Sequence, residues 1–172
     1  LLVLDHRAHG ESEGKYITYG IHERFDIRDW AKLLTDRAGG DVKIVLDGIS
    51  MGATAVLMAS GTDLPDTVTG VVADCGFTSP WDIFSHILHG TFHLGNFPIL
   101  YLVEHMARRR AHFGFRETTT VRAVQSWTKP VLFVHGTADD FVPHEMTEAA
   151  YAACPAADRT LILVEDAMHG CS

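Results

Sequence analysis

Residues 43–55 constrain the fold of this chain more than any other segment. They read Lys-Ile-Val-Leu-Asp, then Gly-Ile-Ser-Met-Gly, then Ala-Thr-Ala. This order predicts an apolar strand, a sharp turn and a helix, with Ser50 raised on the turn where a base can reach its hydroxyl. Side chains in place of Gly48 and Gly52 are expected to collide with the turn or the new helix. The Met51 N–H would then face an oxyanion formed at Ser50.

Two later segments supply an acid and a base. Residues 130–136 read as a buried strand, and the loop that follows contains Asp139; residues 160–164 read as another strand, followed by a loop with His169. Functional groups gather at the carboxyl ends of parallel strands, so Ser50, Asp139 and His169 are expected to meet there. A serine activated by a histidine that a carboxylate orients is the arrangement of nucleophilic acyl transfer.

The order Ser50, Asp139, His169 resembles that of the α/β-hydrolase superfamily. Residues 5–12, Asp-His-Arg-Ala-His-Gly-Glu-Ser, look like that family's Asp-x-Arg-Gly-x-Gly-x-Ser loop, although Ala and His replace the commoner glycines. The chain is most similar to bacterial esterase-like or serine-aminopeptidase-like members, which carry His-Gly-x-x-Asp-x-x-Val-Pro, as residues 135–143 do here. The resemblance implies a catalytic triad with one oxyanion donor at Met51, and we expect neither a cofactor nor a metal.

Strands alternate with helices along the chain, which predicts an α/β fold. A helix is expected over 21–37 and strands at 43–47 and 69–73, before the two later strands. We expect one α/β-hydrolase domain over 1–172, with a mostly parallel sheet and helices on both faces. The stretch 78–129 is too long for a simple crossover and predicts a small helical lid. Its apolar residues either pack on the body or line an acyl pocket: Trp81, Phe84, Leu88, Phe92, Phe97, Ile99, Leu100 and Tyr101.

The ends of the sequence lead to a further expectation. Residues 1–5 already read as a core strand, and Ser172 comes three residues after His169. Members of the resembled family carry earlier strands and a closing helix. The resemblance therefore implies that the first strands are missing and that the chain is an internal part of a longer protein. Expressed alone, it is expected to fold poorly, because an unpaired apolar edge strand invites aggregation.

Composition excludes several classes of protein. The formal net charge of −8 argues against a nucleic-acid partner, since phosphate binding needs clustered cations. No apolar run is long enough to span a membrane, and no signal peptide is visible. Three widely spaced cysteines argue against a disulfide framework and favour a cytoplasmic location. The expected partner is a small-molecule acyl substrate.

Some residues have competing interpretations. Asp74 is an alternative acid, because some α/β hydrolases carry the acid after this earlier strand. Cys75 lies outside the Gly-x-Ser-x-Gly turn and is expected to be a small core residue rather than the nucleophile. For His135 and Asp140 we expect structural or solvent-exposed roles.

Two further groups have both a functional and a structural interpretation. Three histidines at near-helical spacing could bind a metal, but no carboxylate completes the set, and a solvated helix face is the favoured interpretation: His86, His89 and His93. The run Arg108–Arg110 could meet an anionic substrate, although an exposed helix end is favoured.

We interpret the chain as a serine hydrolase that cleaves a carboxylic ester, or a related acyl bond, through an acyl-enzyme. A serine-aminopeptidase-like enzyme would use the same triad. A non-catalytic ligand-binding member of the fold is the third interpretation.

Overall fold

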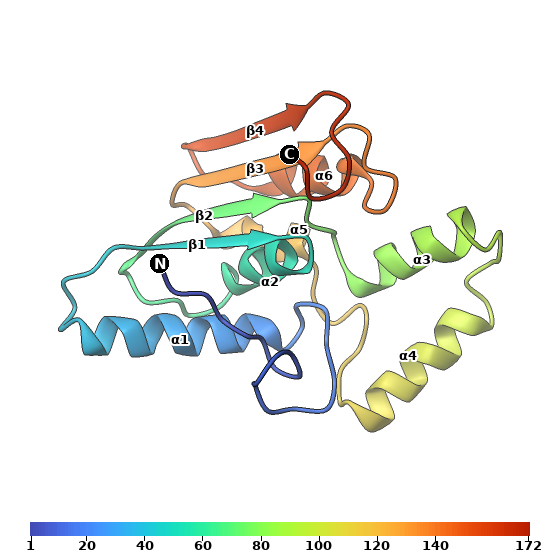
Figure 1. Ribbon diagram of the computed structural model, residues 1–172, viewed down its shortest axis with the longest axis horizontal. Helices are drawn as coiled ribbons and strands as arrows, with labels where there is room; N and C mark the ends of the chain where they lie inside the picture. The colour runs from blue at the N-terminus through green and yellow to red at the C-terminus, as the bar shows by residue number, and fades with distance from the viewer.

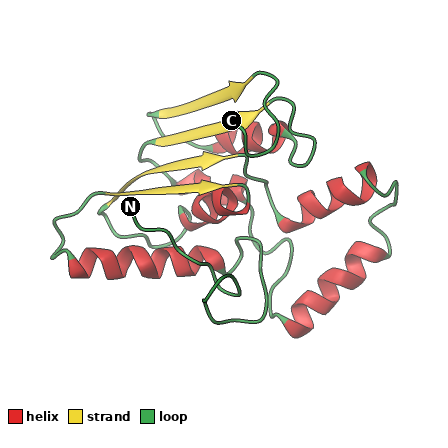
Figure 2. Cartoon of the chain, in the orientation of Figure 1, coloured by secondary structure: helices red, strands yellow, loops and turns green.

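The computed structural model describes residues 1–172 and has a four-stranded parallel sheet in the order β1-β2-β3-β4 (Figure 1). The strands are β1 (Ile44–Ile49), β2 (Val68–Asp74), β3 (Val131–Gly136) and β4 (Arg159–Val164). The helices are α1 (Glu23–Arg37), α2 (Met51–Ala59), α3 (Pro80–Gly90), α4 (Ile99–Arg110), α5 (Thr120–Ala123) and α6 (His144–Ala153), with a short 3-10 helix η1 (Val124–Ser126). The predicted α/β class and parallel sheet are confirmed (Figure 2).

The strand register brings the carboxyl ends of the strands level. Ile49 lies opposite Asp74, Asp74 opposite Val134, and Val134 opposite Ile162. The residues that immediately follow β1 and β2, and those at the end of β3, therefore emerge at one edge of the sheet. This edge is the place where an open α/β sheet carries its functional groups.

The main core lies between the sheet and α2. Every residue of α2 from Ala53 to Ala59 is buried, and the helix packs against β1, β2 and α1. Its alanines allow the backbone to approach the strands closely. Phe133 of β3 is fully buried in the same cluster, with Val71 of β2 and Ala31 of α1. This packing fixes the N-terminus of α2 directly beside the end of β1.

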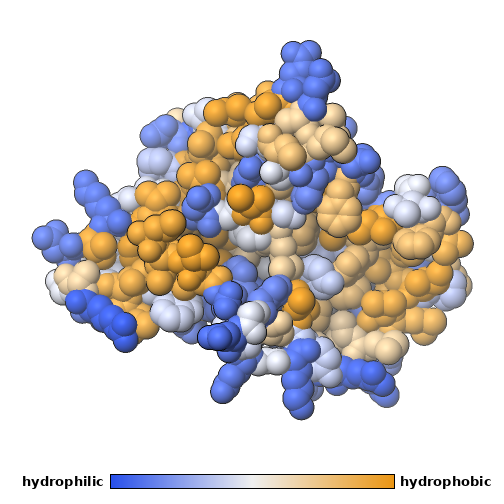
Figure 3. Space-filling model, in the orientation of Figure 1, coloured by the Kyte–Doolittle hydropathy of each residue, from blue (hydrophilic) through white to orange (hydrophobic).

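The helices cover only one face of the sheet. Val45 and Ile49 of β1 and Ile162 of β4 point to the other face and are exposed, and Figure 3 shows hydrophobic surface over the strands. Helices on both faces were expected, because parallel strands are usually buried on both sides. In this chain helices cover one face of the sheet, because α1, α2, α5 and α6 pack together on the same side.

Residues 1–5, expected to form a strand, do not form one. Their backbone N–H and C=O groups make no backbone hydrogen bond, and Leu1 and Val3 are largely exposed. A strand requires a neighbour with which to exchange hydrogen bonds. No strand of this chain lies beside residues 1–5, so their apolar pattern alone does not produce one.

The stretch 78–129 contains the expected helices. α3 and α4 project together from the side of the sheet toward which the strands point (Figure 1). Trp81, Phe84 and Leu88 of α3 pack with Leu100 of α4 in a second, smaller core, which also includes Met58 of α2. Phe92, Phe97, Ile99 and Tyr101 are instead exposed. No helix in the structure combines the length and the apolar character needed to cross a bilayer.

Candidate active site

Ser50 occupies a strained turn between β1 and α2. Its backbone has φ 55° and ψ −116°, a conformation that costs a non-glycine residue about 1–3 kcal/mol. The Ser50 N–H donates to the carbonyl of Asp74 at 2.7 Å, which ties the turn to the end of β2. The predicted strand–turn–helix is therefore present, and it places the hydroxyl at the carboxyl edge of the sheet.

The two glycines of the turn differ in the space available for a side chain. A Cβ on Gly48 would lie 2.4 Å from the backbone carbonyl carbon and oxygen of Gly52, so only glycine fits there. A Cβ on Gly52 would meet no atom within 4 Å. The expectation of a steric need for glycine is thus wrong for Gly52, because its missing side chain would point into open space.

The Met51 N–H is free to bind an anion. It belongs to the first turn of α2, where no preceding helical carbonyl is available, and it donates no hydrogen bond within the chain. It immediately follows Ser50 and carries the partial positive charge of a helix N-terminus. This group can stabilise negative charge that develops next to Ser50.

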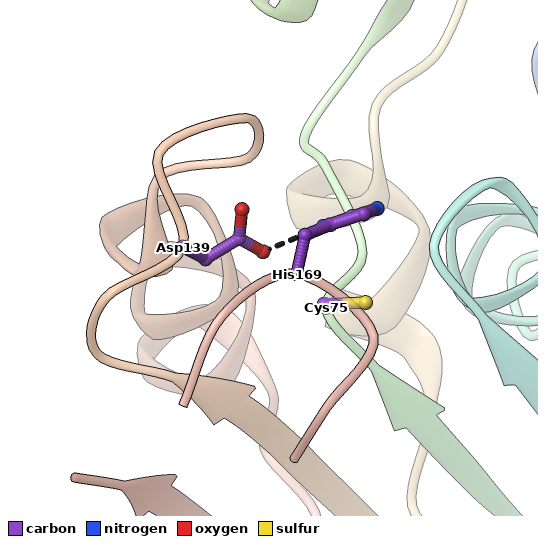
Figure 4. A group of neighbouring side chains, drawn as sticks. All are labelled: Cys75, Asp139 and His169. Carbon is purple, nitrogen blue, oxygen red and sulfur yellow. Dashed lines mark hydrogen bonds and ion pairs between the residues drawn. The ribbon is translucent and has the colours of Figure 1, made fainter. Parts of the chain in front are cut away.

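One hydrogen-bonded chain joins Ser50, His169 and Asp139. The Ser50 Oγ lies 2.9 Å from Nε2 of His169, and Nδ1 of His169 lies 2.6 Å from Oδ2 of Asp139. An ionised carboxylate only accepts, so the proton sits on Nδ1 and Nε2 is left to accept from the serine hydroxyl. Figure 4 shows the imidazole directed at the Asp139 carboxylate from the loop after β4. Both separations lie in the range expected for a nucleophile, a base and an orienting acid.

Asp139 is held as a buried carboxylate. It is 7% exposed, and its Oδ1 accepts from the N–H groups of Phe141 at 3.0 Å and Val142 at 2.8 Å. Burial by itself would raise the pKa of Asp139, but the hydrogen bonds from Val142, His169 and Phe141 outweigh it. The pKa of Asp139 is therefore below its usual value, and the group stays ionised beside His169.

A second imidazole, His135, reaches the same carboxylate. Its Nε2 lies 3.1 Å from Oδ2 of Asp139 and 2.9 Å from the carbonyl of Val142, and its Nδ1 lies 2.7 Å from the hydroxyl of Thr147. His135 is fully buried. The expected structural hydrogen bond is thus made to Asp139 itself, a contact that was not predicted from the sequence. The spacing His-Gly-x-x-Asp was the available signal, because it places both side chains around one tight loop.

Cys75 lies beside the hydrogen-bonded chain without taking part in it. Its Sγ, one oxygen of Asp139 and one nitrogen of His169 all lie within 4.8 Å of one another (Figure 4). Burial raises the pKa of the Cys75 thiol to about 11, so the nucleophilic thiolate is scarce. The hydrogen bond between His169 and Asp139 already uses the facing atoms of that pair, which makes these three residues a poor cradle for a metal.

The side chains of several other candidates form no hydrogen bond with those of Ser50 and His169. Asp74 accepts a hydrogen bond from the hydroxyl of Ser172 at 2.6 Å, and Asp140 is exposed. His86 contacts the carbonyl of Asp140 at 3.3 Å. His93 lies beyond the end of α3 at Gly90, so the three histidines do not form one helical stripe. The run Arg108–Arg110 is the exposed last turn of α4, where cations favourably meet the helix dipole.

The surface next to Ser50 is apolar. Met51 packs against a small cluster that contains Phe77, Ile83 and Val142, together with Tyr19, Phe84, Ile87 and Met146. The ring of Phe141 lies edge-on to His169, with centroids 5.2 Å apart. Three surface cavities of about 340 to 430 Å³ lie elsewhere, and none of their lining residues is Ser50, Asp139 or His169. The surroundings of Ser50 next to α3 are therefore mainly apolar.

The sequence of this chain is similar to one protein family and to one bacterial protein of greater length. The family described as serine aminopeptidase, S33, matches residues 102–171, which include Asp139 and His169. The Bacillus subtilis protein YqkD, described as uncharacterized, is 30% identical over 172 residues, covering 100% of this chain and 56% of that protein. The chain thus spans little more than half the length of this curated relative.

Solved structures are similar over most of the chain. The Pyrococcus furiosus esterase Pf2001 is 25% identical with a TM-score of 0.65, covering 95% of this chain and 60% of that one. A monoacylglycerol lipase from Paleococcus ferrophilus is 22% identical with a TM-score of 0.59, covering 94% and 71%, and at this identity it indicates the fold alone.

Proposed function

We propose that this chain, which belongs to the α/β-hydrolase superfamily, carries the catalytic triad of a serine hydrolase that cleaves carboxylic esters. The observation that carries the proposal is the chain of hydrogen bonds from Ser50 through His169 to Asp139, at 2.9 and 2.6 Å. A strained turn that raises the serine and an unused N–H at Met51 support the same chemistry.

The reaction begins with attack of Ser50 Oγ on the substrate carbonyl carbon. The hydroxyl proton passes to Nε2 of His169, and the resulting imidazolium donates it to the departing alkoxide as the carbonyl–oxygen bond breaks. Water then attacks the acyl-enzyme, with His169 again taking a proton and returning it to Ser50. Asp139 keeps the imidazole in the tautomer that leaves Nε2 unprotonated, and it stabilises the imidazolium without becoming protonated.

The tetrahedral intermediates carry negative charge on the former carbonyl oxygen. Met51 N–H supplies one donor for this oxyanion, reinforced by the N-terminus of α2. Loss of one such donor costs roughly 10²- to 10³-fold in rate in a well-studied hydrolase. We expect a second donor from another loop.

The apolar surroundings of Ser50 favour an acyl chain over a peptide N-terminus. An aminopeptidase must bind an α-ammonium group, which a carboxylate close to the nucleophile would do. Next to Ser50 lie instead Met51 and the cluster around Ile83, while the Asp74 carboxylate is engaged by Ser172. The match to the serine aminopeptidase family supports peptide hydrolysis as the second candidate, with the same triad.

The test is active-site labelling of the full-length protein with a fluorophosphonate. We expect one adduct, mapped to Ser50, that Ser50→Ala abolishes. Ser60→Ala, ten residues along at the end of α2, is the matched control and should label normally. An adduct on Cys75 or on another serine would contradict the proposal, and complete inertness of the folded protein would favour a ligand-binding role.

Substrate class is tested on the same protein. p-Nitrophenyl esters and aminoacyl-anilides are supplied in parallel, and the esters are expected to turn over faster. Faster cleavage of the anilides would replace the esterase proposal with the peptidase one, since both reactions depend on Ser50.

A further inference from the structure

One side of α4 presents an apolar stripe to solvent. Ile99, Leu102, Val103 and Met106 are 39%, 60%, 45% and 49% exposed, whereas Leu100 and Glu104 are buried on the opposite side. At 3.6 residues per turn the four exposed residues fall within an arc of about 100°. We call this stripe the α4 face. It points away from the core that α4 shares with α3.

The apolar surface continues into the loop before α4. Phe92, Leu94 and Phe97 of this loop are also exposed. Figure 3 shows hydrophobic surface over the region where α3 and α4 project. Exposed apolar surface of this extent marks an interaction site more often than chance.

Arginines border the α4 face at its C-terminal end. Arg109 and Arg110 are exposed, lie on the same side of the helix as Met106, and form no ion pair. Arg108 is partly neutralised by Glu104 at 3.1 Å. In a chain of net charge −8, this end of α4 is a local concentration of free positive charge.

The charges favour one occupant for this surface. Glu104 is the only carboxylate of α4, and it faces inward, bound to Arg108 and to Arg116 at 2.7 Å. A second copy packed α4 face to α4 face would therefore offer no carboxylate of its own α4 to Arg109 or Arg110. An anionic lipid surface offers both the phosphates that arginines bind and the apolar layer that the stripe needs. Long arginine side chains can reach headgroups while their stems stay on apolar surface.

We propose that the α4 face and the adjoining Phe92, Leu94 and Phe97 seat this protein on the surface of an anionic lipid layer. The protein would lie on the layer without spanning it. This association is separate from the proposed hydrolysis, because none of these residues touches Ser50 or His169. The sequence shows no apolar run long enough to span a membrane, and association with the surface of a lipid layer requires none.

The test is co-sedimentation of the full-length protein with vesicles, in the absence of any ester. Vesicles of phosphatidylcholine with phosphatidylglycerol are compared with vesicles of phosphatidylcholine alone. We expect binding to the anionic vesicles only, and weaker binding at high salt. Replacing Arg109 and Arg110 together by alanine should lower the affinity roughly 25-fold, from about a fivefold loss per arginine. Leu102→Ser with Met106→Ser should also release the protein.

The matched control lies at the end of α1. Leu33 and Arg37 are an exposed leucine and arginine four residues apart, like Met106 and Arg110, and Leu33→Ser with Arg37→Ala should bind vesicles like the wild type. Circular dichroism and fluorophosphonate labelling verify that every variant is folded. Equal binding by all variants, or no binding by the wild type, overturns the proposal. A wild-type dimer that Leu102→Ser with Met106→Ser converts to monomer would assign the surface to a second copy instead.

Discussion

The carboxyl edge of the sheet buries polar side chains, whereas the α3–α4 projection exposes apolar ones. At the sheet edge Asp139 is buried and accepts hydrogen bonds from two imidazoles and two backbone N–H groups. On α4 apolar side chains are exposed beside unpaired arginines. At the sheet edge, burial and hydrogen bonds hold a few polar atoms in fixed positions, as reacting groups require. On α4, apolar side chains and arginines have no partner within the chain, as is typical of a docking surface.

The comparison predicts its largest effect at Asp139. Asp139→Asn should lower kcat for an ester about 10⁴-fold, the size measured for this change in a serine protease triad, because the imidazole loses its required tautomer. Steady-state kinetics on the full-length protein measure it. Asp140→Asn is the control and should change the rate little; a comparable loss there would mean that the acid has been misassigned.

The same carboxylate sets a pH dependence of stability. The pKa of folded Asp139 is lowered, so its contribution to stability is present above the ordinary carboxyl pKa of about 3.9 and is lost as the pH falls through the folded value. The difference in unfolding free energy between wild type and Asp139→Asn should therefore shrink in acid. Urea melts across a pH series would show this, and a difference that grew on acidification would contradict it.

The next largest effect lies in the core that supports the edge. Phe133 is fully buried between the sheet and its helices. Phe133→Ala should lower the free energy of unfolding by about 3–5 kcal/mol, the range for removing a buried phenylalanine. Thermal or urea unfolding measures it. A loss below 1 kcal/mol would mean that the sheet–helix core is much looser than its packing indicates.

A smaller effect is expected at His135. His135→Gln should weaken a hydrogen bond to a charged group, worth about 1.5–3 kcal/mol, which corresponds to roughly 10- to 100-fold in kcat if it is felt in the transition state. The pH profile of kcat separates positioning from simple loss of fold, because only a disturbed Asp139–His169 pair alters its acid limb. His112→Gln, on an exposed histidine, should leave both rate and profile unchanged.

The smallest effect is expected on α4. Leu102→Ser should change the free energy of unfolding by no more than about 0.5 kcal/mol, because the side chain is already in solvent. Hydrolysis of a water-soluble ester should also be unaffected. A large loss of stability would show that the α4 face packs against another part of the protein in solution, which would remove the contrast between the two regions.

The sequence predicted the elements whose signal is local. Apolar β-branched runs located β1 to β4 within a few residues, and the Gly-x-Ser-x-Gly turn located the start of α2. Asp139 and His169 could be placed beside Ser50 because parallel strands deliver their following loops to one edge.

Features that depend on distant partners could not be predicted in this way. Residues 1–5 have a strand-like pattern, but a strand also needs a neighbour, which no local pattern reports. The uncovered face of the sheet depends on the side to which each crossover brings its helix. Likewise, the contact of His135 with Asp139 depends on how the loop between them folds back. The exposure of the α4 face depends on which side of α4 packs against α3.

The left-handed backbone at Ser50 has a consequence for how the turn can change over time. Glycine adopts a positive φ freely, whereas the conformation of Ser50 costs any other residue about 1–3 kcal/mol. A single replacement of Ser50 by glycine would thus relieve the strain of the turn, at the loss of the hydrogen bond between Ser50 Oγ and Nε2 of His169. Without selection for the hydroxyl, glycine would be tolerated at position 50. The turn that exposes the Ser50 hydroxyl does not need a serine in order to fold. Retention of serine at this position would therefore require selection for the hydroxyl itself.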